Sequence, residues 1–469
     1  MRSNRLPRFI LDVFADRRAS LGLLASCLAL LAAGLDPHVL DAGTVRGRAI
    51  LAEAPSLELL FTVAALTQAG FLLVGGAVAD IWRSERLLRW ALIGLAVASA
   101  GATVLPQGPG LVASRLLAWA CDGLIIPFAI GAVAQLYRQE TRATALGILF
   151  AVYGAGSVLA PTLVTIFGPE GPEIQAFALC AGFALAAVWA TSRWLPDLPG
   201  AQPSQRPFIA ATALWAFGVV VAVDGLVQLE SWLLVSGAII IVIALLALRL
   251  AGGPSGEGVL ARPAGAALAS GLVIGFSQSV PLIVLPAFFL VVQGLDPLLA
   301  NVLIAPFILA LLAAGPLAGW LLGHFSPRVV IIGGVWAIAV ADLAFVVFLA
   351  PGSPYPLFIV PFLLVGAGFA VSTAIRTAVI FASTPRRLPA TAAALNEASL
   401  GVGARLGTTL VVLARSGAFS EGSELYWLQI CLLIAAIVAA TGGVVVFLLL
   451  GPHDPVRTVW ELRDERPRS

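Results

Sequence analysis

A long apolar run recurs along the whole of this sequence. We find fourteen such runs, near residues 19–41, 57–79, 87–106, 110–137, 142–167, 174–194, 207–227, 231–250, 265–292, 297–322, 328–349, 355–382, 389–416 and 425–450. A helix of about 20 residues crosses the hydrocarbon core of a bilayer. Because backbone polar groups in lipid must be bonded within their own segment, such runs form α-helices. The sequence therefore predicts an all-α polytopic membrane protein with fourteen transmembrane helices.

Composition favours the same class. Hydrophobic residues make up 60% of the 469 residues and charged residues only 11%, whereas a soluble domain carries about 25% charged residues. The net charge of +2 gives no indication of a nucleic-acid partner. The four cysteines lie inside apolar runs and the three histidines are not clustered, so we expect no metal site and no cofactor.

The distribution of arginine predicts the orientation. All 27 basic residues are arginine, and arginine accumulates on the cytoplasmic side of a membrane. With a cytoplasmic N-terminus and alternating spans, 21 arginines fall in cytoplasmic segments. Three fall in external loops and three within spans, namely Arg46, Arg48 and Arg415 outside and Arg115, Arg376 and Arg405 inside the spans. We therefore expect both termini to be cytoplasmic and the protein to lie in a bacterial cytoplasmic membrane.

Two polar linkers and a weak repeat divide the chain. The linkers at 196–207 and 251–263 predict an N-terminal six-helix bundle over residues 1–195, linkers and a two-helix insert over 196–263, a C-terminal six-helix bundle over 264–452, and a cytoplasmic tail over 453–469. Gly76 and Gly319 occupy matching places 243 residues apart, although Gly323 stands where a repeated acidic residue would fall. A duplicated six-helix unit is typical of transporters with a central site between their halves.

The second predicted helix ends in a short polar motif, Gly76-Ala-Val-Ala-Asp80-Ile-Trp-Arg83-Ser-Glu85-Arg86. Its glycine allows a neighbouring helix to approach closely. A carboxylate such as that of Asp80 is favoured at a helix N-terminus, so we expect Asp80 to cap a neighbouring helix. A plausible partner is the helix that starts near Arg386 and Arg387.

Charged residues also lie within the first and fourth predicted helices. The first ends in Leu35-Asp36-Pro37-His38-Val-Leu-Asp41, and the fourth carries Arg115 and Asp122 before Pro127. Residues spaced three or four apart share a helix face. Arg115 and Asp122 are seven apart, which is the sum of two such steps, so they lie on one stripe of the helix. Because a charge at the bilayer centre costs roughly 2.5–3.5 kcal/mol or more, these groups require partners or water.

The fifth predicted helix follows the segment Glu140-Thr-Arg142-Ala-Thr-Ala-Leu-Gly147 and continues with Gly156 and Pro161. In their order and spacing, these four patterns resemble the major facilitator superfamily, and within it the 14-helix drug:proton antiporters. The resemblance covers the first six helices well and the C-terminal half more loosely.

The resemblance implies a proton-coupled exporter of small molecules. It makes Asp36, Arg115 and Asp122 candidates for proton coupling or substrate contact, with Asp41 and Glu397 as further candidates. It makes Gly76, Asp80 and Arg86 a conformational latch, and Gly147, Gly156 and Pro161 an antiporter-type helix. The expected partners are a small-molecule substrate, protons and the lipid bilayer, and the expected state is a monomer.

Two other functions remain open from the sequence. A solute importer or exchanger would use the same fold, because fold alone does not decide direction. A membrane protein that does not transport would carry another activity, for which no motif is present. Among the other embedded acids, Asp342 is expected to be a boundary residue at the outer part of its helix.

Overall fold

The computed structural model describes residues 12–36, 56–82, 84–105, 108–166, 173–198, 206–227, 231–250, 262–383, 389–415 and 424–450. Every regular element within these ranges is a helix. The first six long ones are α2 (Arg17–Leu35), α4 (Ser56–Ile81), α5 (Ser84–Val104), α6 (Gly108–Leu136), α7 (Gln139–Ile166) and α8 (Glu173–Trp194). Asp41, Arg83, Arg386 and Arg387 lie outside the described residues.

The remaining elements follow in two groups. The first is the pair α9 (Arg206–Val227) and α10 (Ser231–Leu250). The second comprises α11 (Arg262–Ala287), the π-helical turn η3 (Phe288–Val292), α12 (Pro297–Val302), α13 (Ala305–Ala314), the 3₁₀ turn η4 (Gly315–Leu317), α14 (Ala318–His324), α15 (Pro327–Phe348), α16 (Pro356–Ser383), α17 (Pro389–Arg415) and α18 (Glu424–Leu450).

Proline explains several of these boundaries. α12, α15, α16 and α17 all begin with proline, which has no N–H to leave unpaired in a first helical turn. The predicted apolar run at 297–322 is divided into α12, α13, η4 and α14. Pro306 and Pro316 lie in the first turns of α13 and η4. Because proline cannot donate to the preceding turn, the helix breaks at these points.

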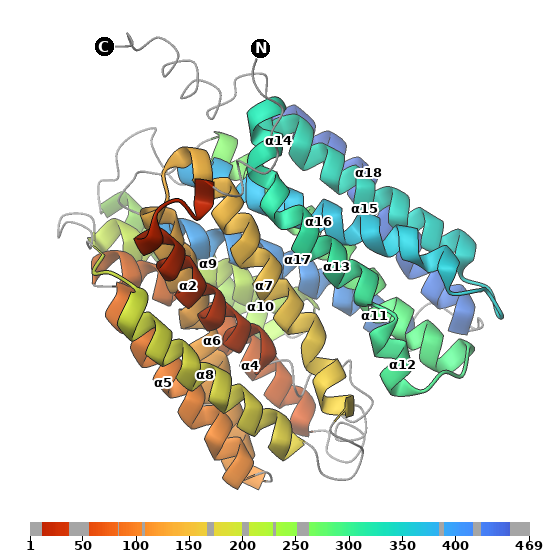
Figure 1. The fold of residues 1–469 in the computed structure, drawn as a ribbon, viewed down its shortest axis with the longest axis horizontal. Helices are drawn as coiled ribbons and strands as arrows, with labels where there is room; N and C mark the ends of the chain where they lie inside the picture. Colours follow the sequence, from red (N-terminus) through yellow and green to blue (C-terminus); the bar gives the residue numbers. More distant parts are fainter. Residues whose placement is uncertain are drawn as a thin grey trace.

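The helices form two groups that meet along a long interface (Figure 1). Helices α2, α4, α5, α6 and α8 pack chiefly on one another, as do α11, α13 and α15 to α18, whereas α7 packs on α2 and still more extensively on the C-terminal group. The two groups touch where α17 packs against α4 and α6, and where α7 packs against α13, η4, α14 and α16. The pair α9 and α10 joins this assembly through α9, which packs against both α4 and α17.

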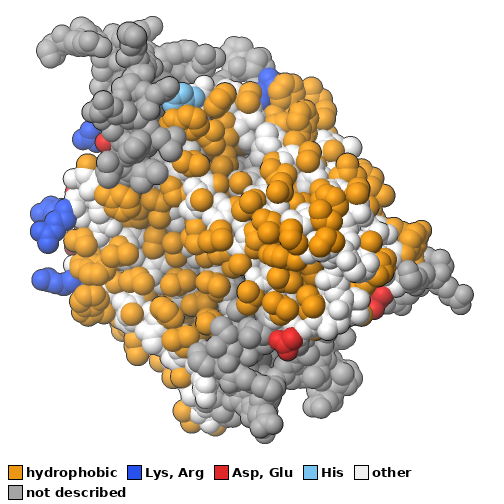
Figure 2. All heavy atoms as spheres, turned by 45° about the vertical axis from the view of Figure 1, so that its right-hand side comes forward, with side chains coloured by type: hydrophobic (Ala, Val, Ile, Leu, Met, Phe, Trp, Pro, Cys, Tyr) orange, Lys and Arg blue, Asp and Glu red, His pale blue; other side chains and the backbone are white. Residues whose placement is uncertain are grey.

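The outer surface is apolar over a broad band. Trp90, Val347 and Leu448 are each 70% exposed, and Figure 2 shows a hydrophobic face whose charged side chains lie near its edges. A soluble protein rarely exposes so much contiguous apolar surface. Ten helical stretches of the described chain are long and apolar enough to cross a membrane, one of them running from α12 to α14. The band is therefore the surface that faces lipid.

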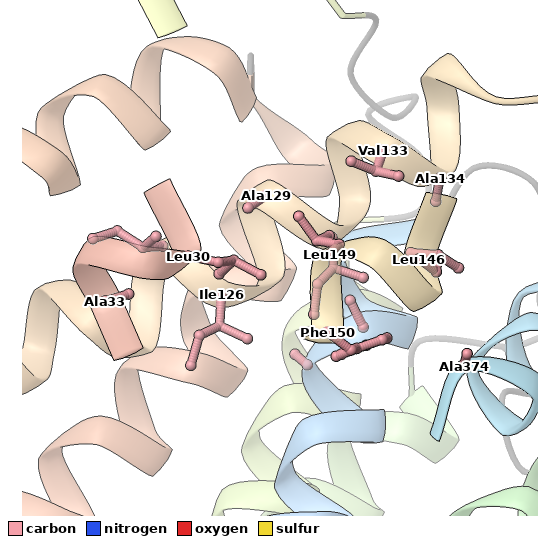
Figure 3. Close-up of a cluster of buried hydrophobic side chains, with 14 of the residues drawn as sticks. Leu30, Ala33, Ile126, Ala129, Val133, Ala134, Leu146, Leu149, Phe150 and Ala374 are labelled. Atoms are coloured by element: carbon pink, nitrogen blue, oxygen red, sulfur yellow. The ribbon is translucent and has the colours of Figure 1, made fainter. Parts of the chain in front are cut away.

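The interior of the N-terminal group is filled by aliphatic and small side chains. Figure 3 shows part of this cluster, drawn from α2, α6 and α7 with one residue of α16: Leu30, Ala33, Ile126, Ala129, Val133, Ala134, Leu146, Leu149, Phe150 and Ala374. The many alanines let the helices approach closely, as is typical of membrane bundles. Polar residues inside this packing therefore stand out as candidates for function.

Candidate functional site

A buried ion pair joins α2 to α6. An Nη atom of Arg115 lies 3.0 Å from an Oδ atom of Asp36, and the two side chains are 1% and 0% exposed. Asp36 is the C-terminal cap of α2. Its other oxygen accepts a hydrogen bond of 2.5 Å from the hydroxyl of Ser99 on α5. The guanidinium also lies 4.1 Å from the ring centre of Phe177 on α8. Four helices of the N-terminal group thus enclose the pair.

Asp122 lies on the same helix as Arg115 but has a different partner. Its carboxylate accepts a hydrogen bond from the side-chain amide of Gln68 on α4. The neighbouring Gly123 makes this contact possible, because a Cβ atom there would meet the backbone of α4 at Gln68 and Leu72. The stripe expected from the sequence is therefore divided: Arg115 turns to Asp36, and Asp122 turns to α4.

A second polar cluster lies on the C-terminal side of the interface. Glu397 of α17 is buried and accepts a hydrogen bond of 2.9 Å from the amide of Asn396. Arg376 of α16 is 0% exposed and donates to the hydroxyl of Ser399 at 3.1 Å and to the carbonyl of Asn396 at 3.2 Å. Gly271 of α11 leaves the space that the guanidinium occupies. The sequence placed Arg376 within a span but assigned it no role.

Tyr153 of α7 connects the two clusters. It lies on the helix that packs against α16, beside the contact of α17 with α4 and α6, and its phenol group is within electrostatic reach of the carboxylates of Asp122 and Glu397. Groups from α4, α6, α7, α16 and α17 therefore meet where the two halves face each other. No feature of the sequence indicates Tyr153, because a single tyrosine in an apolar helix carries no local signal of its surroundings.

At one end of this interface, Asp80 of α4 binds the first turn of α17. Its two carboxylate oxygens accept hydrogen bonds from the backbone N–H groups of Ala390 at 2.9 Å and Thr391 at 2.7 Å. Backbone N–H groups in a first helical turn have no partner within their own helix. Asp80 supplies that partner from the other half of the molecule. This is the kind of capping contact that the sequence predicts for Asp80.

Glycines bring the helices together beside Asp80. A Cβ atom on Gly76 would lie 2.6 Å from Cβ of Ala394 and 2.8 Å from the carbonyl oxygen of Ala390. The Cβ position of Gly131 on α6 lies 3.2 Å from Cα of Ala390. The start of α17 therefore packs directly on the backbones of α4 and α6. Arg86, which the sequence assigned to the same latch, is exposed in the first turn of α5.

A matching contact joins α7 to the other half. A Cβ atom on Gly147 would collide with the carbonyl of Gly315 in η4, and one on Gly319 would collide with Thr144 of α7. Gly319 is the repeat counterpart of Gly76, so both inter-half contacts depend on glycine. Gly156 instead packs within its own half, near Leu31 of α2. Pro161 lies in α7, and its side chain is outside the described residues.

Two groups of long apolar helices that meet along an interface define the class of this protein, a polytopic membrane protein. The chain belongs to the Major Facilitator Superfamily, whose family description matches residues 14–256 and 267–467. Members of this family are transporters and not enzymes. The chain is a multi-pass protein of the cell membrane.

Three known proteins illustrate the similarity. The methyl viologen resistance protein SmvA of Salmonella typhimurium is 24% identical over 431 residues, which cover 87% of this chain and 85% of that protein. The puromycin resistance protein pur8 of Streptomyces alboniger is 29% identical over 388 residues, covering 77% and 75%. The solved structure of the proton:xylose symporter XylE shares the fold, with a TM-score of 0.63 at 15% identity, over 95% of this chain and 99% of that one.

Proposed function

We propose that this protein exports small organic molecules across the cell membrane and is driven by protons. The observation that carries the coupling is the enclosed pair Asp36–Arg115. The names of two relatives, which refer to resistance to methyl viologen and to puromycin, support export. An ion gradient is the expected source of energy, because the sequence contains no G-x-x-x-x-G-K-[ST] motif for nucleotide binding.

The pair provides a way to load and release a proton. While Arg115 stays beside Asp36, the opposite charges of the two buried side chains compensate each other. If the halves rearrange and Arg115 moves away, the carboxylate of Asp36 is left in a site of low dielectric without a counter-charge. It then takes up a proton, because a buried, unpaired charge is strongly disfavoured. The movement of one arginine would thus couple protonation to the change of state.

Substrate would bind where the two halves meet. Asp122 and Glu397 supply negative charge from opposite halves, and Tyr153 supplies an aromatic group near both. Carboxylates and aromatic rings attract organic cations. Methyl viologen, named for a relative, is such a cation. We therefore propose cationic, partly aromatic molecules as the first substrates to test.

We further propose fourteen spans with both termini in the cytoplasm, divided as residues 1–195, 196–263, 264–452 and 453–469. A described helix falls within each of the fourteen predicted apolar runs, and the arginine distribution supports the orientation. The latch of Gly76 and Asp80 would then close the cytoplasmic side. The protein would act as a monomer, because each half supplies part of the proposed site.

The test is transport in two steps. Cells that lack their own exporters and express the protein are first screened against toxic organic cations. A compound against which the protein protects the cells is then added to inverted membrane vesicles with and without a pH gradient. We expect uptake that collapses with an uncoupler, and proton release when the substrate is added to the purified protein. Should Asp36→Asn and Asp122→Asn both release protons like the wild type, the coupling site lies elsewhere, with Glu397 as the first candidate.

An importer remains the second candidate, because XylE, a symporter, has the same fold. Transport in right-side-out vesicles separates the two directions. Uptake into such vesicles that requires an inward proton gradient, without protection of cells, would favour import.

A further inference from the structure

Asp342 in α15 is a fully buried acid that plays no part in the site described above. Its side chain is 0% exposed. Neither carboxylate oxygen has a hydrogen-bond partner among the described residues. This burial differs from the expectation of a boundary residue, because neighbouring helices enclose the side chain. Water does not reach the carboxyl group because α15 packs against α16 on one side and α18 on another.

The neighbourhood of Asp342 is apolar. One turn further along α15, the ring of Phe345 packs on Phe358 and Phe362 of α16. One turn earlier, Ile338 lies against Gly368 of α16. Ser277 of α11 donates its hydrogen bond to the carbonyl of Ala435 on α18, and Gln429 of α18 donates to the carbonyl of Leu349. These two polar side chains of the packed helices are therefore engaged with backbone.

The charged groups of the packed helices lie away from Asp342, whereas the thiol of Cys431 belongs to the same apolar cluster as Ala341 and Phe345. Among the described side chains, the charged and titratable groups are Arg328 on α15, His324 on α14, Arg376 on α16, and Glu424, Tyr426 and Cys431 on α18. Arg376 is 14 residues along α16 from Phe362, which is roughly 20 Å of helix. Arg328 and Glu424 lie in the first turns of their helices. The described charged side chains thus leave Asp342 without a counter-charge.

A carboxylate that is buried without a counter-charge or hydrogen bonds is strongly disfavoured, and such a group becomes neutral by binding a proton. We propose that Asp342 is a second proton-binding site, located in the C-terminal half and occupied in this arrangement of the helices. The proton would leave when α15 moves relative to α16 and water reaches the carboxyl group. This inference rests on the proposed proton-driven export and adds a second coupled proton to each cycle.

The close contact between α15 and α16 fits such a movement. A Cβ atom on Gly334 would lie 2.7 Å from the carbonyl oxygen of Gly368, so the two backbones touch at this point. The contact lies two turns from Asp342 along α15. A small shift there would change the packing around the carboxyl group.

The first experiment asks whether the proton is present. Infrared difference spectra of purified protein report the carbonyl stretch of a protonated carboxylic acid. We expect such a band in the wild type and its loss in Asp342→Asn. The band should remain in Asp36→Asn, because the carboxylate of Asp36 in the wild type is paired with arginine and does not contribute to it. A spectrum in which Asp342→Asn loses no band would overturn the proposal. Thermal unfolding of each variant shows that it is folded.

The second experiment asks whether the proton is used. Each coupled proton multiplies the steady-state accumulation by about tenfold per unit of pH gradient. Asp342→Asn should therefore accumulate substrate roughly tenfold less per unit of gradient, while exchange without a gradient continues. Asp342→Glu, which keeps a protonatable group, should restore accumulation. If the wild type is coupled and Asp342→Asn accumulates equally well, this inference alone fails. A wild type without coupling overturns the proposed function, and Asp342 then has no role in transport.

Discussion

At the level of single residues, the membrane makes each buried charge expensive, and the partner of each charge determines what it can do. Asp36 and Arg115 are 79 positions apart and meet at 3.0 Å with almost no exposure. Asp122, seven positions after Arg115, is held by an amide instead. An acid with an arginine beside it and an acid with a neutral donor respond differently when the helices move. The same residue type can therefore serve coupling at one place and substrate contact at another.

The Asp36–Arg115 pair can be tested by a double-mutant cycle. Asp36→Asn or Arg115→Ala alone leaves an unpaired buried partner, which costs about 3–5 kcal/mol. We expect the double variant to be less destabilised than the sum of the single variants, because neither charge is left. Thermal unfolding in detergent measures the effect, and Asp12→Asn, at an exposed position, is the control. Purely additive losses would show that the two charges do not depend on each other.

At the level of secondary-structure elements, the two halves are joined by a helix cap and by close backbone packing at glycines. Asp80 completes the first turn of α17 from across the interface, and Gly76 removes the side chain that would keep the helices apart. The counterpart contact of α7 with η4 and α14 uses Gly147, Gly315 and Gly319 but has Gly323 where an acid would fall. The two contacts are therefore similar in packing and unequal in charge.

Replacing Asp80 tests the cap. Asp80→Asn keeps one acceptor oxygen and loses the charge that favours a helix N-terminus, which should weaken the contact by about 0.5–2 kcal/mol. We expect normal folding and slower transport, because the closed arrangement is less populated. Transport by reconstituted protein and its unfolding temperature give the two readouts. Transport at the wild-type rate would count against a latch at this position.

Adding a side chain at Gly76 tests the packing. The Cβ of Gly76→Val would meet Ala394 at 2.6 Å, and such overpacking costs typically 1–3 kcal/mol. We expect the halves to separate at this end, so that a cysteine placed at Thr391 reacts faster with a thiol reagent. Gly182→Val is the matched control, because nothing lies within 4 Å of its Cβ position. Equal reactivity in the two variants would show that Gly76 does not hold the contact closed.

At the level of the whole molecule, the two groups of helices meet along α4, α6 and α7 on one side and α13, α14, α16 and α17 on the other. The polar groups Asp122, Tyr153, Arg376 and Glu397 belong to these helices. A relative movement of the groups would therefore open and close the region where charge is concentrated. The pair α9 and α10 covers the interface beside α4 and α17, so it is placed to move with the change of state.

The orientation of the whole molecule can be measured by labelling. Single cysteines at Gln107 and Glu170, in a background without native cysteines, should react with an impermeant reagent on intact cells. A cysteine at Arg138 should react only after the cells are permeabilised, because the arginine distribution places it in the cytoplasm. Labelling in the opposite pattern would reverse the proposed orientation. The four native cysteines are buried, so their removal is expected to leave the surface unchanged.

The sequence by itself determined the class and the positions of the helices. Long apolar runs have no alternative in lipid to the α-helix, although the run at 297–322 is expected to be one helix and is divided into α12, α13, η4 and α14. Local motifs also indicated that Asp80 would cap a neighbouring helix. These features depend on neighbours in the sequence or on the solvent, and both can be read from the order of residues.

Only the tertiary structure decided which charges meet. Lipid is as apolar as the packed interior, so a membrane helix carries little pattern to show which face turns inward. The sequence could not separate Arg115 from Asp122, and it placed Asp342 at a boundary although the bundle encloses it. Nor could it bring Tyr153 and Arg376 to the interface of the halves. These arrangements arise from contacts between helices far apart in the chain, and the packing of the whole bundle sets them.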